Sequence, residues 1–114
     1  MATTTEYRSS SVTAESWEPL IEEGRETGQI HWLRREGEGG PLAGLWRISA
    51  EEGAEIPYRA NGIDNFHVIQ GEAELETAAG DRIPLVTGGI YSFPDGFTAT
   101  WRTKSNFVKF FVVG

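Results

Sequence analysis

The segment from Gly88 to Trp101 constrains the fold of this chain more than any other. Gly88 is followed by a short apolar run, by Pro94-Asp95-Gly96, and then by a second run with β-branched and aromatic residues. Proline fixes φ at the entry of a turn, and glycine supplies a positive φ at its exit. The spacing therefore predicts a strand that enters a tight turn and continues directly as the next strand.

Similar short runs recur along the chain, separated by Gly, Pro, Asn and Asp. This pattern is typical of an antiparallel sandwich or barrel. Helix is expected to be limited to a turn or two within Glu18–Glu26, and tight hairpin turns are predicted at Gly71 and at Ala78–Asp81. The predicted strands are Gln29–Arg34, Ala43–Ser49, Asn65–Gln70, Glu72–Thr77, Arg82–Leu85, Ile90–Phe93, Thr98–Arg102 and Phe107–Val113.

Length and composition narrow the possible classes of protein. A chain of 114 residues with 39% hydrophobic content can form one core, and its net charge of -7 argues against a nucleic-acid partner. No apolar run approaches the roughly 18 residues that cross a membrane. The absence of cysteine excludes disulfides and thiol nucleophiles, and it favours a cytoplasmic protein. We predict a flexible Ser/Thr-rich tail over residues 1–16 and one domain over residues 17–114.

The last predicted strand, Phe107–Val113, carries apolar residues on both faces. Such a strand must be covered on both sides. One cover is the barrel interior, and the other is a partner subunit or the N-terminal segment around Trp17 and Leu20. We expect a homodimer, because symmetric dimers are the commonest oligomers and an exposed apolar strand favours aggregation.

Four anchors occur in order along the chain: Gly44-Leu45-Trp46, the run from Asp64 to Glu72, the Gly88–Trp101 segment, and Val108–Val113. On these anchors the sequence resembles small single-domain cupins over roughly residues 17–113. Within that superfamily it is most similar to the ureidoglycine-aminohydrolase type. The resemblance implies a jelly-roll (RmlC-like) β-barrel of about six to eight strands, usually dimeric, with a ligand site inside the barrel mouth.

The sequence departs from the metal-binding pattern of that superfamily, in which histidines and a glutamate form the first motif and another histidine belongs to the second. The resemblance places the glutamate on Asp64, the paired histidines within Pro57–Ala60, and the last histidine on Ala99. None of these positions holds a histidine, and a metal needs several converging ligands. His67 lies three residues beyond Asp64 and so points to the opposite face of a strand. We expect no metal and no other cofactor.

The remaining interior positions predict an aromatic pocket around one carboxylate. If Asp64 and Ala99 face inward, as the resemblance implies, then Phe66 and Trp101 face inward too. Such a pocket suits a small polar or cyclic molecule. The predicted catalytic residues are Asp64 and Tyr58, and the predicted ligand-binding residues are Trp46, Arg59, Phe66, Tyr91 and Trp101.

Each of these residues also has a purely structural interpretation. Large aromatic side chains fill small barrels, so Trp46 and Trp101 are equally candidates for the core. Asp64 follows an Asn-Gly pair and is a candidate for an Asx turn. Arg59 is a candidate ion-pair partner of Asp64. Tyr58 is a candidate strand-entry residue whose hydroxyl group is exposed to water.

Three classes of function remain open. The first is a metal-free cupin that binds a small molecule in the barrel mouth. The second is a metal-independent isomerase, cyclase or lyase that uses Asp64 as general base and Tyr58 as general acid. The third is an accessory or structural dimer with a filled barrel. We predict the first, because alanine at position 99 leaves room in the interior.

Overall fold

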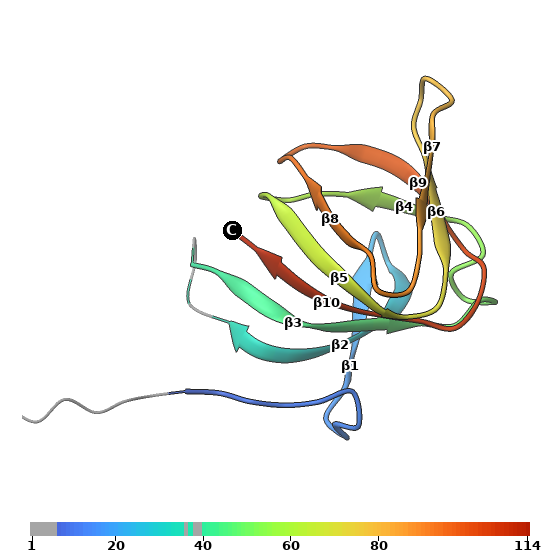
Figure 1. The fold of residues 1–114 in the computed structure, drawn as a ribbon. Helices are drawn as coiled ribbons and strands as arrows, with labels where there is room; N and C mark the ends of the chain where they lie inside the picture. The colour runs from blue at the N-terminus through green and yellow to red at the C-terminus, as the bar shows by residue number, and fades with distance from the viewer. Residues whose placement is uncertain (1–6, 36, 38–39) are drawn as a thin grey trace, which may run out of the picture.

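The computed structural model describes residues 7–35, 37 and 40–114, and every helix or strand within these ranges is a β-strand (Figure 1). The N-terminal half contributes β1 (Glu18–Glu22), β2 (Arg25–Arg35), β3 (Leu42–Ile48) and β4 (Ile56–Arg59). The C-terminal half contributes β5 (Asp64–Gln70), β6 (Ala73–Glu76), β7 (Arg82–Leu85), β8 (Ile90–Phe93), β9 (Thr98–Thr103) and β10 (Phe107–Val113).

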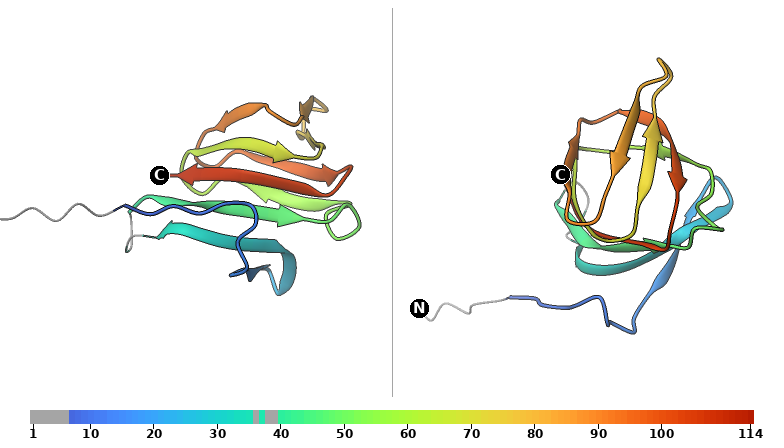
Figure 2. Two further views of the ribbon diagram at one scale, coloured as in Figure 1. Left: turned by 60° about the horizontal axis from the view of Figure 1, so that its bottom comes forward. Right: turned by 45° about the vertical axis from the view of Figure 1, so that its right-hand side comes forward.

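These strands form two antiparallel sheets that curve around a common interior (Figure 2). The larger sheet has the order β1-β2-β3-β10-β5-β8, and the smaller has the order β4-β9-β6-β7. Consecutive strands repeatedly switch from one sheet to the other, as they do in a jelly roll. The prediction of an all-β antiparallel jelly-roll barrel is therefore confirmed.

The eight predicted strands are all present, with ends shifted by a few residues at most places. The helical turn predicted within Glu18–Glu26 is wrong, because this segment forms a β-hairpin in which Glu22 pairs with Arg25. Glu23 and Gly24 adopt φ values of 52° and 75°, which suit a two-residue hairpin turn. The hairpin extends the larger sheet, so the structure has more strands than the resemblance implies.

The hairpin predicted at Gly71 is also wrong, because β5 and β6 lie in different sheets. Gly71, with φ of 91°, instead turns the chain across the end of the barrel. The hairpin predicted at Ala78–Asp81 is confirmed, since β6 pairs with β7. The predicted turn at Pro94–Gly96 is confirmed as well, with Phe97 N–H donating to the Pro94 carbonyl at 3.1 Å.

Alternation along β5 and β10 determines what lines the interior. In β5 the side chains of Asp64, Phe66 and Val68 are buried, while Asn65 and His67 are exposed. In the adjacent β10 the buried positions are Phe107, Lys109 and Phe111. The centre of the core is formed by the largest fully buried side chains, Trp101, Phe107, Leu75, Leu85 and Val68.

The segment before β1 contacts the outer side of the larger sheet. Of the tail predicted over residues 1–16, residues 1–6 lie outside the described ranges. The Ser10 hydroxyl lies 2.6 Å from His31 Nε2, and the Arg47 guanidinium lies 3.9 Å from the centre of the Trp17 ring. Within the described ranges no helix is long and apolar enough to cross a membrane.

Two glycines with the same backbone conformation allow a matched test of the sheet-to-sheet turn. Gly71 and Gly80 both have φ of 91°, so alanine at either position strains the backbone. A Cβ at Gly71 would also collide with the Asn106 carbonyl oxygen, whereas a Cβ at Gly80 would meet nothing within 4 Å. We expect Gly80→Ala to cost about 1–2 kcal/mol and Gly71→Ala clearly more in urea unfolding. Equal losses of unfolding free energy in the two variants would contradict the close approach of the Gly71 turn to Asn106.

Candidate functional site

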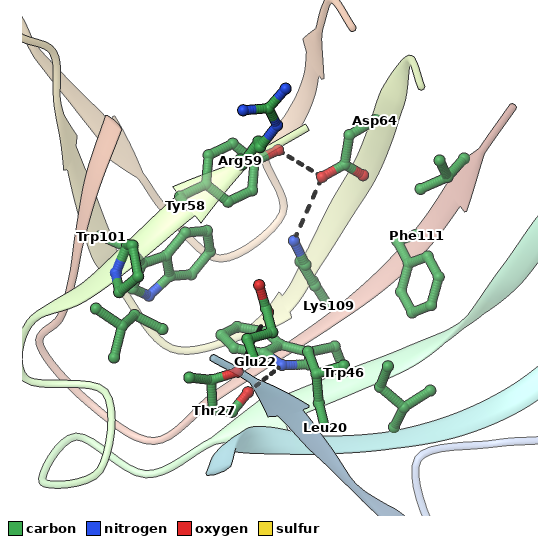
Figure 3. Close-up of a pocket in the computed structure, with 14 residues that line it drawn as sticks. Leu20, Glu22, Thr27, Trp46, Tyr58, Arg59, Asp64, Trp101, Lys109 and Phe111 are labelled. Carbon is green, nitrogen blue, oxygen red and sulfur yellow. Dashed lines mark hydrogen bonds and ion pairs between the residues drawn. The ribbon is translucent and has the colours of Figure 1, made fainter. Parts of the chain in front are cut away.

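A cavity of about 150 Å³ lies inside the barrel between the two sheets (Figure 3). The smaller sheet contributes Tyr58 from β4 and Trp101 from β9, and the larger sheet contributes Trp46, Asp64 and Lys109. Because these residues come from five different strands, the fold and not a local motif assembles the cavity wall.

Asp64 is the central polar group of this wall. Its side chain is 10% exposed, and both of its polar neighbours approach the same oxygen, Oδ2. The Tyr58 hydroxyl donates a hydrogen bond to Oδ2, and Lys109 Nζ lies 3.8 Å from it. The other oxygen, Oδ1, is buried and has no hydrogen-bond partner among the described residues. Asp64 therefore retains one buried acceptor that the rest of the wall does not satisfy.

Lys109 extends along the interior toward Asp64, surrounded by aromatic rings. Its Nζ lies 4.1 Å from the centre of the Phe66 ring, 5.1 Å from the Trp46 and Trp101 rings, and 5.5 Å from the Tyr58 ring. Each ring face attracts an ammonium by about 0.5–2 kcal/mol. The rings also exclude water from the amine, so Lys109 occupies an aromatic box.

Burial lowers the pKa of Lys109, because the charged form loses its hydration. The carboxylates of Asp64 and, more weakly, Glu22 oppose this shift. The ion pair of Nζ with Asp64, at 3.8 Å, is longer than a hydrogen bond. The amine is thus held near the cavity by packing and charge, with its hydrogens still available to a bound molecule.

Tyr58 fixes the orientation of Asp64. Burial raises the pKa of Tyr58 well above its usual value, and the charge of Asp64 adds to this shift. The phenol therefore stays protonated and directs its hydrogen to Asp64 Oδ2. Rings of Phe93, Phe97 and Trp101 pack around it at 5.8–6.2 Å. This arrangement commits the hydroxyl hydrogen to Asp64, so Tyr58 acts as a positioning residue.

The structure brings most of the sequence-predicted site residues together. Trp46, Tyr58, Asp64 and Trp101 line the cavity, and Phe66 contacts Lys109 beside it. Arg59 also borders the cavity, although its side chain is exposed.

Tyr91, like Phe66, is a predicted site residue that does not line this cavity. Its ring packs on Phe66 at 5.5 Å between ring centres, and its hydroxyl accepts a hydrogen bond from Val86 N–H at 3.0 Å. It borders a separate hollow with Ile90 and Phe110.

The contacts of Trp46, Trp101, Asp64 and Arg59 decide between the structural interpretations of these residues and a role in the cavity. Trp46 N–H donates to the Thr27 carbonyl and Trp101 N–H to the Thr103 hydroxyl, so both indoles are anchored in the core while lining the cavity. The turn at Gly62 is held by the carboxylate of Asp95, not by Asp64, at 2.8 Å. The cation paired with Asp64 is Lys109, not Arg59.

Sequence reasoning missed Lys109, the residue that changes the chemistry of the site most. The signal was present in the alternation of the last strand, because Lys109 lies between Phe107 and Phe111 on the inward face. A single lysine within an apolar stripe indicates a buried charge that needs a partner.

The residues around Asp64 do not fit a metal ion. Across the described ranges no group of three or more His, Cys, Asp or Glu side chains is placed to hold one. Ala99, opposite Tyr58 in the β4–β9 pairing, offers no side-chain donor. The Lys109 ammonium would repel a cation at Asp64. The available groups are a carboxylate, an amine and aromatic faces.

Comparison with known proteins identifies relatives of this chain. The profile of the EutQ-like cupin domain family matches residues 42–111. The curated deoxyuridine 5'-triphosphate nucleotidohydrolase of Rhizobium etli is 36% identical over 69 residues, covering 57% of this chain and 44% of that protein. The chain thus spans less than half the length of that relative.

Solved structures support the same architecture. A putative ethanolamine utilization protein Q from Salmonella typhimurium has a TM-score of 0.64 at 17% identity, covering 86% of this chain and 93% of its own. An RmlC-like cupin from Ralstonia eutropha has a TM-score of 0.68 at 14% identity, covering 87% and 62% respectively. At these identities the likeness shows the fold.

Removal of Lys109 tests whether the buried pair supports the fold. Lys109→Met keeps the side-chain length but leaves the Asp64 carboxylate buried without its cation, which should cost about 3–5 kcal/mol. The double variant Lys109→Met/Asp64→Asn should recover part of that loss, since no charge then remains. The measurement is chemical unfolding at neutral pH. As a control, Lys104→Met on the surface should change stability by less than about 0.5 kcal/mol. A similarly small effect at Lys109 would refute the role of the pair.

Proposed function

The chain belongs to the EutQ-like cupin domain family, and we propose that it binds a small polar or cyclic molecule in the cavity beside Asp64 and Lys109. One observation carries the proposal: Asp64 Oδ1 is a buried acceptor without a donor among the described residues. Such an atom costs about 1–3 kcal/mol when unsatisfied. An N–H or O–H of a bound molecule would recover this free energy.

The cavity restricts the chemistry of the ligand. A volume of about 150 Å³ is enough for a benzene-sized group, so the part of the ligand inside the cavity has about six non-hydrogen atoms. Asp64 requires a hydrogen-bond donor on the ligand. The Lys109 ammonium, 3.8 Å from Asp64 Oδ2, can donate hydrogen bonds to an acceptor on the same ligand. The indole rings of Trp46 and Trp101 present flat apolar surfaces. A small ring or short chain with a donor next to a carbonyl oxygen satisfies all these groups.

The size of the cavity argues against the activity named for the Rhizobium relative. A nucleoside triphosphate is several times larger than a molecule of about six heavy atoms. Among the described residues, Arg59 is the one guanidinium that borders the cavity, and Asp64 and Glu22 place negative charge there. We therefore do not extend nucleotide hydrolysis to this chain.

The other two predicted functions fit the contacts less well. A filled accessory barrel is disfavoured by the cavity itself. An acid/base enzyme remains the second candidate, favoured by the depressed pKa of Lys109. In that case Lys109 replaces Tyr58 as the partner of Asp64 in proton transfer, because the Tyr58 hydroxyl is already engaged.

Binding of a five-membered lactam, 2-pyrrolidinone, tests the proposed function. Its N–H suits Asp64 Oδ1 and its carbonyl suits Lys109, so we expect saturable tryptophan quenching with millimolar affinity. In Asp64→Asn the side-chain oxygen must accept the Tyr58 hydrogen bond, which turns the amide N–H₂ toward the former position of Oδ1. The variant should bind at least about tenfold more weakly.

The control for this experiment is His67→Asn, which lies on the outer face of the same strand and should bind the lactam normally. Absence of saturable quenching in the wild type, or equal affinity in wild type and Asp64→Asn, would contradict the proposed site.

The expected homodimer remains a proposal, and its interface would be the outer face of β10, β5 and β8. Ile90, Phe110 and Val112 border one hollow there, and Ile90 is 79% exposed. An exposed apolar surface of this kind is typical of protein contacts. A cytoplasmic location likewise remains a prediction.

A charge on this face tests the dimer. Ile90→Arg should shift the protein from dimer to monomer in sedimentation velocity, because the guanidinium would be buried against a second copy. Ile21→Arg is the matched control, since Ile21 is also exposed, at 57%, but lies on β1 at the opposite end of the sheet. A wild-type monomer, or a dimer unaffected by Ile90→Arg, would refute this interface.

A further inference from the structure

We propose that Lys109 is a nucleophilic amine that condenses with the carbonyl group of a small aldehyde or ketone held in the cavity. The proposal rests on the proposed function, because it places the substrate in the same cavity. It adds a covalent step and a substrate class.

The position of Lys109 suits a nucleophile better than a purely structural cation. A lysine retained only for packing would have its amine satisfied by hydrogen bonds, whereas the ion pair of Nζ with Asp64 Oδ2, at 3.8 Å, is longer than a hydrogen bond. Nζ instead lies over the Phe66 ring. It is also near the rings of Trp46, Tyr58 and Trp101 at the cavity wall (Figure 3). The loss of hydration favours the neutral amine, which is the reactive form, although the ring faces themselves attract the ammonium.

Asp64 is placed to receive the proton that Lys109 must lose. Transfer of one proton from the ammonium to the carboxylate leaves a neutral amine beside a neutral acid, without a net charge change in the cavity. Tyr58 holds the same carboxyl group in place by donating a hydrogen bond to Oδ2. The pair can therefore exchange a proton across 3.8 Å with a small movement of the flexible lysine side chain.

The condensation then balances without any further reagent. The amine lone pair attacks the carbonyl carbon, a C–N bond forms, and the carbonyl π electrons move to oxygen. A proton moves from nitrogen to that oxygen, giving a carbinolamine. Asp64 returns its proton to the hydroxyl group, the C–O bond breaks, and water leaves. The product is a protonated imine whose positive charge lies where the ammonium was, next to the restored carboxylate.

A hydroxyl group next to the carbonyl would place the substrate. The hydroxyl hydrogen can be donated to the Asp64 carboxyl group, which lines the cavity, while the carbonyl carbon faces Lys109. Glycolaldehyde combines both groups within the size that the cavity allows. It is therefore the probe of choice.

The chain provides its own control for the experiment, because Lys104 and Lys109 are its only lysines. The Lys104 side chain is 56% exposed, whereas Lys109 is buried. The wild-type protein is treated with dilute glycolaldehyde and cyanoborohydride, and hydroxyethyl groups on each lysine and on the N-terminal amine are quantified by peptide mass spectrometry. We expect Lys109 to react at least about tenfold faster than Lys104, because the carbonyl is bound beside it.

Three comparisons make the result specific. In guanidinium chloride the preference for Lys109 should vanish, since the cavity is lost. An excess of 2-pyrrolidinone should slow labelling at Lys109 and leave Lys104 unchanged. Asp64→Asn should slow the reaction at Lys109 alone, while His67→Asn should not.

Labelling of Lys104 or the N-terminal amine as fast as Lys109 in the folded protein would overturn the inference. If 2-pyrrolidinone still binds in that case, the cavity is a binding site without imine chemistry, and only the inference falls. If the lactam does not bind either, the proposed function falls as well.

Discussion

The ion pair between Lys109 and Asp64 is the constraint on which the interior of this barrel depends. The two residues come from adjacent strands, with Lys109 opposite Val68 and Asp64 opposite Val113, so the lysine must extend along the sheet to reach the carboxylate. A slip of one residue in this pairing would bury neighbours such as His67 and separate the charges. Because an unpaired buried charge is costly, the pair favours one register of β5 against β10.

The aromatic side chains of the interior support this pair in two ways. Phe66, Trp46 and Trp101 surround the lysine amine and keep water away, which strengthens its attraction to Asp64. Tyr58 adds a hydrogen bond that orients the carboxylate and leaves Oδ1 unsatisfied. The wall residues thus pack in the core and line the cavity at the same time, so the two interpretations of Trp46 and Trp101 are compatible.

Much of the fold could be predicted from short-range patterns, and the site only in part. The resemblance to cupins correctly placed Asp64 inside, and alternation along β5 extended this to Phe66. The Pro94–Gly96 spacing correctly predicted a turn. The turn at Gly71 was misjudged because a tight turn does not reveal whether its flanking strands pair. Tyr91 was placed in the pocket because its strand leads into the Pro94 turn, and that position does not give the distance of its side chain from the cavity. Lys109 needed the strand pairing, since nothing local connects it to Asp64.

The absence of the histidine ligands and the presence of Lys109 fit one electrostatic arrangement. By its resemblance to metal-binding cupins, Asp64 occupies the position of a carboxylate ligand, and a buried carboxylate requires a positive charge nearby. Lys109 supplies that charge at 3.8 Å without any further ligand, so the neighbouring Ala99 and Tyr58 need no metal donor. An ammonium differs from a metal ion in one respect that matters for chemistry: it can give its proton to Asp64 and become a nucleophile. The ion pair that accounts for the charge balance of the barrel therefore also changes the reactions that its interior can support.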